Sequence, residues 1–442
     1  MLARRFVALA WVSLVPQSVA AQTHVAPETP LSVEQTRATV EAVARVIDSI
    51  YVFPEQRAVI SSKLRAELAA GRYASLDATA LAARITDDLK AVSNDRHLWM
   101  RWSPPEYAAA SMPASDSGMA RDAYYAAVGR RRNQGIEELR ILPGNIRYVR
   151  YTNFLWEPDV TGRAIDDAMR FLRDGDAMIV DLRGNGGGSA GAVQYAISHF
   201  LKGDLPLMSF YDGRTGERTE TRTIEYLPTG RLPAKALYVL TDGGTGSAAE
   251  EFAYHVQQFK LGTLIGQKTA GAANNNELYP VTPGFILSVS FGRPTHPISK
   301  TNWEGTGISP DVAIPPGQAL DKAQALALDR LASTATDDEA KARYLWAKDA
   351  VDARLHPVTL SAAELGKYVG RYGERTVRLE KGELIYSRPG RGDTRLTVLT
   401  PDLFAFGELS FIRVRFIRGG NRVVALEALY DDGRHERYDR DR

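Results

Sequence analysis

The strongest constraint on the fold is a unit that occurs twice: a short apolar run, a glycine-rich turn and a segment with helical spacing. In the first copy Ala177–Leu182 leads through Gly184-Asn-Gly-Gly-Gly188 into residues 190–201. In the second, Ala236–Leu240 leads through a turn with three glycines into residues 248–259. Strand, turn and helix in this order are the unit of a parallel sheet covered by helices. We therefore expect an α/β core whose two glycine turns lie side by side at the carboxyl ends of their strands, where such sheets bind ligands.

The second turn places Ser247 directly before a predicted helix. The first amides of a helix have no intrahelical partner, and the helix dipole there favours negative charge. A serine hydroxyl at this point can attack a carbonyl carbon while the amide of Ala248 binds the oxyanion, with the amide of Gly187 as a second donor. Two simpler interpretations stay open: Ser247 is an ordinary helix N-cap, and the glycines only permit tight turns.

A serine nucleophile needs a base, and the chain offers seven histidines: His24, His97, His199, His255, His296, His356 and His435. His255 follows Ser247 by eight residues on the same predicted helix, about 12 Å along its axis, and is out of reach. Four others lie far down another helix, near the termini or in the C-terminal part of the chain. His97 and His296 remain, and spacing does not separate them. Glu304, in a loop, could orient either imidazole, or could simply be a solvated carboxylate.

The rest of the chain divides by composition and periodicity. Residues 31–92 predict three short helices, and His97 stands at the head of an alternating strand that opens the α/β core, residues 93–316. Within the core, residues 103–134 are expected to be irregular, either a mobile loop over the site or a surface excursion. Residues 317–356 predict a helical linker. Residues 357–442 contain short alternating strands at regular spacing, which indicates a small antiparallel sandwich or barrel.

The N-terminus and the composition point to an exported protein. Residues 1–21 combine a basic start, a short apolar run and small residues at Val19-Ala-Ala21, the pattern of a secretory signal peptide. The apolar run is roughly half of the ~20 residues that a membrane anchor needs. The chain has no cysteine, which excludes disulfides and thiol catalysis, and its formal charge of +2 gives no indication of nucleic-acid binding. We expect a bacterial periplasmic or secreted protein without a membrane span.

Four stretches in the right order resemble the tail-specific, or C-terminal processing, serine peptidase family, in particular its branch with the tricorn protease core and the interphotoreceptor retinoid-binding protein modules. These stretches are Asp181–Gly188, Ser247-Ala-Ala-Glu250, Gly266–Ala273 and Asn302–Asp311. The similarity runs from about Leu31 to Pro316. It implies a crotonase- or ClpP-like βα core and a serine-type peptidase acting on a peptide or protein.

The resemblance also assigns roles. The serine of the Ser-Ala-Ala-Glu turn is the family's nucleophile, which implies Ser247. The tail-specific branch activates this serine with a lysine in a Gly-Lys-Gly step, but here the step is Gly271-Ala-Ala273, and Lys268 does not align with it. The tricorn-like branch uses a histidine and a glutamate at positions that match His97 and Glu304. The resemblance therefore favours His97 over His296.

Some features depart from the family. The stretch between Trp102 and Ile146 is too short for a PDZ-like module, and the segment after Pro357, lipocalin-like in character, lies outside the peptidase. Two other functions stay open: an esterase or amidase that uses the same triad on a small molecule, and a non-catalytic protein that binds a hydrophobic ligand. No cofactor or metal is expected, because the chain has neither cysteines nor a histidine pair at ligand spacing. The sequence does not indicate an oligomeric state.

Overall fold

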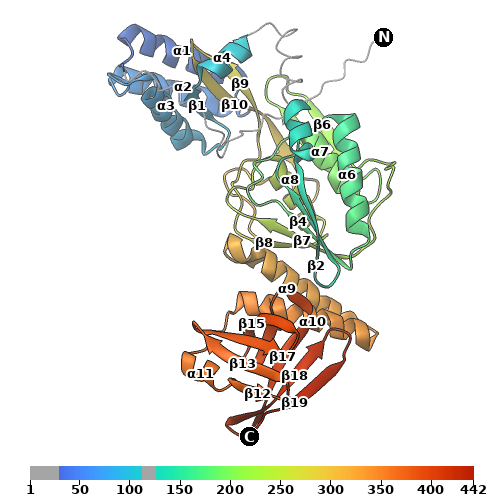
Figure 1. The fold of residues 1–442 in the computed structure, drawn as a ribbon. Coiled ribbons are helices and arrows are strands. Elements are labelled where there is room, and N and C mark those ends of the chain that lie inside the picture. Colours follow the sequence, from blue (N-terminus) through green and yellow to red (C-terminus); the bar gives the residue numbers. More distant parts are fainter. Residues whose placement is uncertain (1–28, 112–125) are drawn as a thin grey trace. The chain divides into compact units, whose positions relative to one another are not determined.

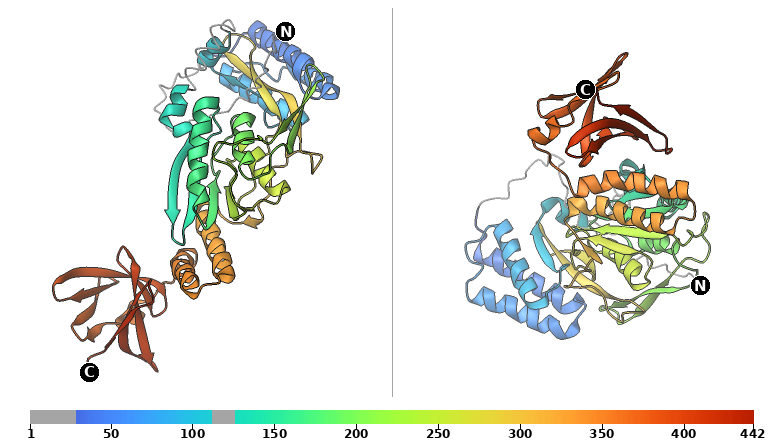
Figure 2. Two further views of the ribbon diagram at one scale, coloured as in Figure 1. Left: turned by 90° about the vertical axis from the view of Figure 1, so that its right-hand side faces the viewer. Right: turned by 90° about the horizontal axis from the view of Figure 1, so that it is seen from below.

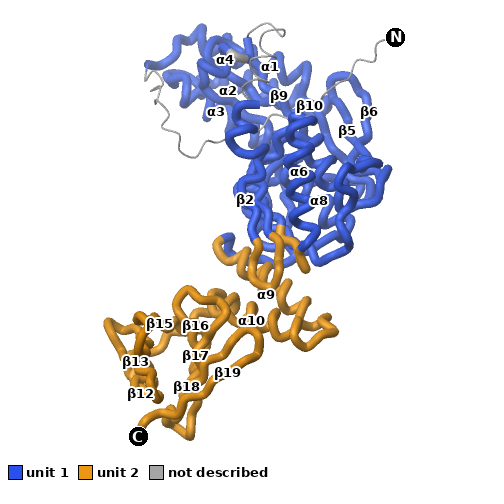
Figure 3. Tube along the Cα trace, turned by 45° about the vertical axis from the view of Figure 1, so that its right-hand side comes forward, with its two compact units in different colours: residues 1–140, 148–174, 180–316 blue, residues 141–147, 175–179, 317–442 orange. Residues whose placement is uncertain are grey.

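The computed structural model describes residues 29–111 and 126–442, which form two compact units (Figure 3). The first unit comprises residues up to 140 together with 148–174 and 180–316, and the second comprises 141–147, 175–179 and 317–442. The predicted signal peptide lies outside the described residues. Within the described ranges, none of the helices has the length and apolar character that crossing a membrane requires.

The N-terminal segment forms the three predicted helices, α1 (Val33–Ile50), α2 (Pro54–Ala69) and α3 (Ala78–Ser93). Their starts follow from the sequence: Ser32 forms a capping box with Gln35, α2 begins at a proline, and Asp77 accepts a hydrogen bond from the Ala80 amide. Their buried faces form one apolar cluster with the strands described next.

The first sheet joins this helical segment to the core (Figures 1 and 2). Its order is β1-β10-β5-β6, with β9 also paired to β10, and its pairings are antiparallel. The strands are β1 (Trp99–Trp102), β5 (Pro206–Asp212), β6 (Arg218–Arg222), β9 (Asn275–Pro280) and β10 (Phe285–Thr295). Because β1 pairs with β10, the residues just before β1, His97 among them, are held against a segment far along the chain.

The second sheet is the predicted α/β core, with strand order β11-β8-β7-β4-β3-β2. Its strands are β2 (Ile136–Leu142), β3 (Ile146–Tyr151), β4 (Ala177–Asp181), β7 (Ala236–Thr241), β8 (Thr263–Gly266) and β11 (Val312–Ala313). The helices that alternate with them are α6 (Pro158–Arg173), α7 (Ala190–Ser198) and α8 (Ala248–Gln258). β8 pairs in parallel with β7 and with β11, and every residue of β4 is buried. The two strand–turn–helix units are therefore neighbours, as predicted.

The segment at residues 103–134 differs from the prediction. It was expected to be irregular, but α4 (Pro104–Ser111) is helical, residues 126–131 are helical, and a 3₁₀ turn follows at Asn133–Gly135. The sequence explains the helix, because Pro104-Pro105 is followed by five helix-compatible residues, and proline is well suited to the first turn of a helix. The middle of this segment, residues 112–125, lies outside the described residues.

The second unit contains two long helices and an all-antiparallel β domain. The helices are α9 (Pro316–Thr334) and α10 (Asp338–Leu355), and a short helix, α11 (Ala362–Gly366), precedes the strands. Eight strands follow in sequential order: β12 (Gly370–Tyr372), β13 (Arg375–Glu380), β14 (Glu383–Arg388), β15 (Arg391–Thr400), β16 (Leu403–Phe406), β17 (Leu409–Gly419), β18 (Arg422–Tyr430) and β19 (His435–Asp439).

This meander is nearly closed into a barrel. After β19 the Asp441 amide donates to the Arg371 carbonyl oxygen on β12 at 2.9 Å. The interior is filled by aromatic side chains, since Tyr368, Phe404 and Phe416 are at most 2% exposed and their ring centroids lie 4.7–5.4 Å apart. The predicted all-β C-terminal domain is thus present, as a near-barrel with a packed centre.

Candidate active site

Ser247 has an unusual backbone conformation at the junction of β7 and α8. Its φ of 51° and ψ of −122° lie outside the regions that L-residues favour. An ordinary cap such as Ser32 is extended, with φ −64° and ψ 158°. A non-glycine residue in a sparsely populated region costs roughly 1–3 kcal/mol and persists only where the surrounding structure imposes it. The N-cap interpretation does not account for this strain, whereas the sharp strand-to-helix turn of a serine nucleophile does.

The first glycine turn lies directly against Ser247. A Cβ atom built on Gly187 would fall 2.7 Å from the Ser247 Cβ and 2.9 Å from the Ala248 nitrogen, so only glycine fits there. The Ala248 amide is the first of α8 and lacks an intrahelical partner. The Gly187 amide, by contrast, donates to the Asn185 side-chain oxygen at 2.9 Å. Both predicted oxyanion donors are therefore next to the serine, and one of them is engaged within the turn.

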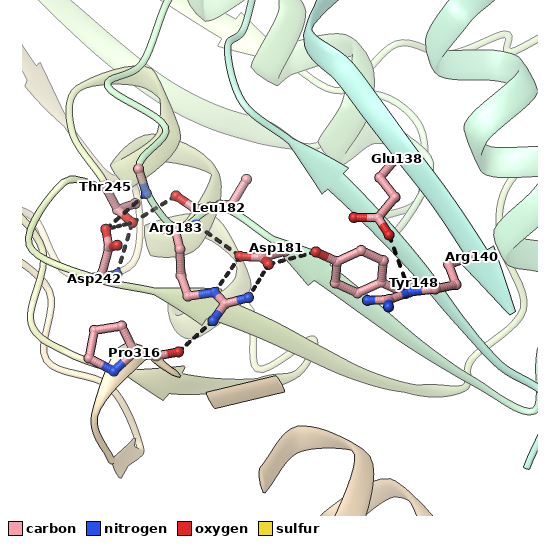
Figure 4. Close-up of polar contacts among 10 residues, drawn as sticks. Glu138, Arg140, Tyr148, Asp181, Leu182, Arg183, Asp242, Thr245 and Pro316 are labelled. Atoms are coloured by element: carbon pink, nitrogen blue, oxygen red, sulfur yellow. Dashed lines mark hydrogen bonds and ion pairs between the residues drawn. The ribbon is translucent and has the colours of Figure 1, made fainter. Parts of the chain in front are cut away.

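Hydrogen bonds join the two glycine turns, as Figure 4 shows in part. The Gly246 amide donates to the Asn185 carbonyl oxygen at 2.9 Å, and Thr245 Oγ1 donates to the Leu182 carbonyl oxygen at 2.9 Å. Arg183 fixes the start of the first turn, because its guanidinium binds both carboxylate oxygens of Asp181, at 2.9 and 2.5 Å, and the Pro316 carbonyl oxygen. The side-by-side arrangement of the turns is as predicted.

Glu250 connects the serine turn to the loop that follows β8. Its Oε2 accepts from the amides of Ser247 and Ala272, each at 2.9 Å. Its Oε1 accepts from Thr269 Oγ1 at 2.5 Å and from the Gly271 amide at 2.7 Å. The side chain is fully buried, and burial raises the pKa of its carboxyl group. One carboxylate thus holds Ser247 and Ala272 within two hydrogen-bond lengths of each other.

The next two amides of the same loop hold Glu304. Its Oε2 accepts from Ala273 at 2.6 Å and from Asn274 at 2.7 Å, and its Oε1 accepts from the Arg96 amide at 3.0 Å. Because Ala272 and Ala273 are adjacent, an unbroken chain of short contacts runs from the Ser247 turn to Glu304.

Glu304 lies in a cluster with His97 and Asp95. One ligand-type atom of each residue lies within 4.8 Å of the others. Asp95 and His97 are 1% and 5% exposed, and the His97 amide donates to Asp95 Oδ1 at 2.8 Å. The His97 carbonyl oxygen accepts a 2.5 Å hydrogen bond from Ser288 on β10. His97 Nδ1 is buried without a hydrogen-bond partner.

The electrostatics of this cluster favour uncharged forms. Burial lowers the pKa of His97, and the nearby Asp95 carboxylate offsets this only in part. Burial raises the pKa of Glu304 to about 7, and the charge of Asp95 adds to the effect, although three amide hydrogen bonds oppose it. An imidazole that is neutral at physiological pH is what a general base requires.

The other candidates lie elsewhere. His296 is fully buried among aromatic rings and beside His255, with ring centroids 5.2 Å apart. Lys268 is exposed. The structure therefore brings Glu304 together with His97, and the site residues Asp95 and Asn274 were not predicted. A signal for Asp95 was present, because an aspartate two residues before a histidine can bind its backbone amide.

A strained serine at a sharp strand-to-helix turn in an α/β core is the arrangement in which many serine hydrolases expose their nucleophile. Residues 145–314 match the model of peptidase family S41, and residues 31–125 match the N-terminal domain of Peptidase_S41 in eukaryotic IRBP. The chain thus carries a peptidase family S41 domain together with an N-terminal domain of that family, and this similarity indicates a serine-type peptidase. This agrees with the resemblance stated above.

Individual relatives are distant. The carboxy-terminal processing protease CtpB of Bacillus subtilis (strain 168) is 25% identical over 183 residues, which cover 40% of this chain and 35% of that protein. The match thus spans about a third of that relative. Among solved structures, a Parabacteroides merdae ATCC 43184 putative peptidase is 20% identical with a TM-score of 0.44, covering 69% of this chain and 98% of its own. A Streptococcus agalactiae lipoprotein is 17% identical with a TM-score of 0.44, covering 68% and 98%.

Proposed function

We propose that the protein is an exported serine peptidase in which Ser247 is the nucleophile, His97 the general base and Glu304 the carboxylate that orients and stabilises the imidazolium. The substrate would be a peptide or protein. The observation that carries the proposal is the backbone of Ser247, which has a φ of 51° at the start of a buried helix. A serine with an extended backbone would cap the helix better, so capping does not explain this conformation.

The reaction follows the general course of serine acyl transfer. The Ser247 hydroxyl attacks the scissile carbonyl while His97 accepts its proton, and the same proton then passes to the leaving amine. The developing oxyanion is met by the free Ala248 amide at the positive end of α8. The Gly187 amide becomes a second donor when it shares or releases its bond to Asn185. Water then cleaves the acyl-enzyme by the reverse proton path.

Glu304 is suited to the third role because its position is fixed and its charge is conditional. Three backbone amides hold its two oxygens. Its pKa of about 7 means that a positive charge on His97 would draw it into the ionised form. Glu304 thus supplies negative charge when the imidazolium forms. Before that, its neutral form avoids the desolvation cost of a buried charge.

The test is covalent labelling by a fluorophosphonate, followed by intact mass. We expect one adduct that is lost in Ser247→Ala and His97→Ala. The matched controls are Ser189→Ala and His296→Gln. Ser189 caps α7 with an ordinary extended backbone, and His296 is the alternative base. Labelling that persists in Ser247→Ala, or is lost only in His296→Gln, would overturn the assignment. Peptide and ester substrates compared on the same preparation separate the peptidase from an esterase or amidase.

Export rests on residues 1–21 alone. When the chain is expressed with its native N-terminus in a bacterium, we expect the mature protein in the periplasm or medium, beginning at Ala21 or Gln22. A cytoplasmic protein that retains Met1 would contradict this part of the proposal.

A further inference from the structure

The cluster of Asp95, His97 and Glu304 brings two carboxyl groups together without a cationic side chain beside them among the described residues. Among the described residues, neither Asp95 nor Glu304 forms an ion pair with a lysine or arginine; their hydrogen bonds come from backbone amides and from Asn274. Two carboxylates at such short range repel each other strongly in a buried site. A cation at this position would remove the repulsion.

Two buried atoms in the cluster also lack the partner that a buried polar atom normally has. His97 Nδ1 and Asn274 Oδ1 have no hydrogen-bond partner, and the two residues are 5% and 1% exposed. Asn274 belongs to the cluster, since its Nδ2 donates to Asp95 Oδ2 at 3.2 Å. Both unpartnered atoms can act as electron-pair donors to a metal ion. Leaving a buried polar atom unpaired costs about 1–3 kcal/mol, which a bound ion would recover.

The donor set selects the kind of ion. One imidazole nitrogen and two carboxylates suit Zn²⁺ and similar transition metals better than Ca²⁺ or Mg²⁺, which prefer oxygen alone. Ligands on one Zn²⁺ ion at about 2.0–2.2 Å are at most about 4.4 Å apart. The cluster atoms lie within 4.8 Å of one another, so small side-chain rotations suffice.

We infer that Asp95, His97 and Glu304, assisted by Asn274, form a binding site for a divalent transition-metal ion of the Zn²⁺ type, and that the bound ion inhibits the enzyme. The inhibitory part rests on the proposed function; the binding part does not. Such a site leaves no signal in the spacing of the sequence, because its ligands come from three separate segments.

The mechanism of inhibition follows from the histidine tautomer. A metal ion on Nδ1 takes the lone pair of that nitrogen and places the ring proton of the neutral imidazole on Nε2. Nε2 then donates a hydrogen bond and cannot accept the serine proton. The ion also ties up Glu304, so neither the base His97 nor its carboxylate partner would be available until the metal is removed.

Binding is tested on the purified full-length protein, stripped with a chelator, by Zn²⁺ titration against a chromophoric competitor and by the visible spectrum of the Co²⁺ form. We expect one equivalent of Zn²⁺, bound more than roughly 100-fold more weakly in Asp95→Asn and in Glu304→Gln, because losing a ligand costs at least as much as losing its outer-shell support. Asp95→Asn preserves size: its oxygen can still accept from the His97 amide, and its NH₂ group can donate to Asn274 Oδ1 once the Asn274 amide turns over, so its fold should survive. Thermal unfolding verifies this.

The matched control is His435→Gln, which removes an exposed histidine 3.0 Å from Glu427 in the β domain. It should bind Zn²⁺ like the native protein. Equal affinity in the native protein and both cluster variants, weakened binding in His435→Gln, or no binding at all would each overturn the site.

Inhibition is tested separately by the rate of fluorophosphonate labelling. Stoichiometric Zn²⁺ should slow labelling of Ser247 at least tenfold, with full recovery after chelation. Labelling that is unchanged at saturating Zn²⁺ would refute the inhibitory role. A protein that binds Zn²⁺ at the cluster but is never labelled, with or without metal, would instead refute the proposed function and leave the metal site standing.

Discussion

Replacing Glu250 by glutamine should lower the activity strongly while lowering the free energy of unfolding only slightly. The Glu250 carboxylate accepts four hydrogen bonds, from the amides of Ser247, Gly271 and Ala272 and from Thr269 Oγ1. In Glu250→Gln the side-chain oxygen can still accept hydrogen bonds from the Ser247 and Ala272 amides. The new NH₂ group can donate to Thr269 Oγ1, but it faces the Gly271 amide, which is also a donor.

The cost to stability is small because two effects oppose each other. Losing one hydrogen bond to a charged acceptor costs roughly 1.5–3 kcal/mol. Burial raises the pKa of Glu250, so the carboxylate is held against a desolvation penalty that a neutral amide avoids. We expect the free energy of unfolding to fall by about 1–2 kcal/mol, given these opposing contributions.

The cost to activity should be larger. If Gly271 moves away from the NH₂ group, the loop carries along the Ala273 and Asn274 amides that hold Glu304. A misplacement of about 1 Å at a catalytic group can cost on the order of 100-fold in rate. We therefore expect kcat, and the rate of fluorophosphonate labelling, to fall about 100-fold while the protein remains folded.

The control lies next in the chain. Glu251 is buried on the same helix, and its contact with His255 is 3.6 Å, too long for a hydrogen bond. Burial raises the pKa of Glu251 to about 8, so it is largely protonated at pH 7 and glutamine resembles the form present. Glu251→Gln should change neither kcat nor stability appreciably. If Glu250→Gln keeps kcat within about threefold, or if the two variants behave alike, the bridging role is wrong.

Other outcomes follow from the same geometry. The labelling rate should rise as the pH increases through about 7, because Glu304 ionises there, and this rise should be absent in Glu304→Gln. A labelling rate of the native protein that does not change with pH would contradict the role of Glu304. Ser247→Gly should raise the melting temperature, with a gain of roughly 1 kcal/mol from relief of the positive φ, whereas Ser247→Ala should not. Gly187→Ala should abolish labelling, because its Cβ would lie 2.7 Å from that of Ser247. Burial lowers the pKa values of His255 and His296 to about 3, so at pH values between 6.5 and 3 the unfolded chain binds protons that the folded chain does not. The free energy of unfolding, measured with urea, should therefore decrease as the pH falls from 6.5 towards 3. A free energy of unfolding that does not change over this range would contradict the burial of the two neutral imidazoles.

The elements that the sequence predicts well are those defined by local signals. The helices α1 and α3 have side-chain caps and periodic apolar faces, and β4 and β7 are continuous apolar runs followed by glycine turns. β6 (Arg218–Arg222) is not predictable in this way, because it is a polar, largely exposed edge strand. Its sequence therefore has no alternating hydrophobic pattern.

For the site, Ser247 and its helix amide are predictable because strand, turn and helix are contiguous. The choice between His97 and His296 is not, because it depends on how β1 pairs with β10. Asp95 and Asn274 could not be connected by spacing either, since they belong to different segments that meet only in the folded chain.

The two kinds of sheet should also fold at different rates. In the C-terminal meander each strand pairs with its neighbour in sequence, so loop closures are short and the domain can form quickly. The first sheet requires β1 to find β10, and the Ser288 hydroxyl meets a carbonyl 191 residues away in sequence. During synthesis His97 therefore has no fixed position until the chain beyond Ser288 has emerged. His97 is made before Ser247 but is held in place after it, so the growing chain would pass most of its synthesis without the proposed site.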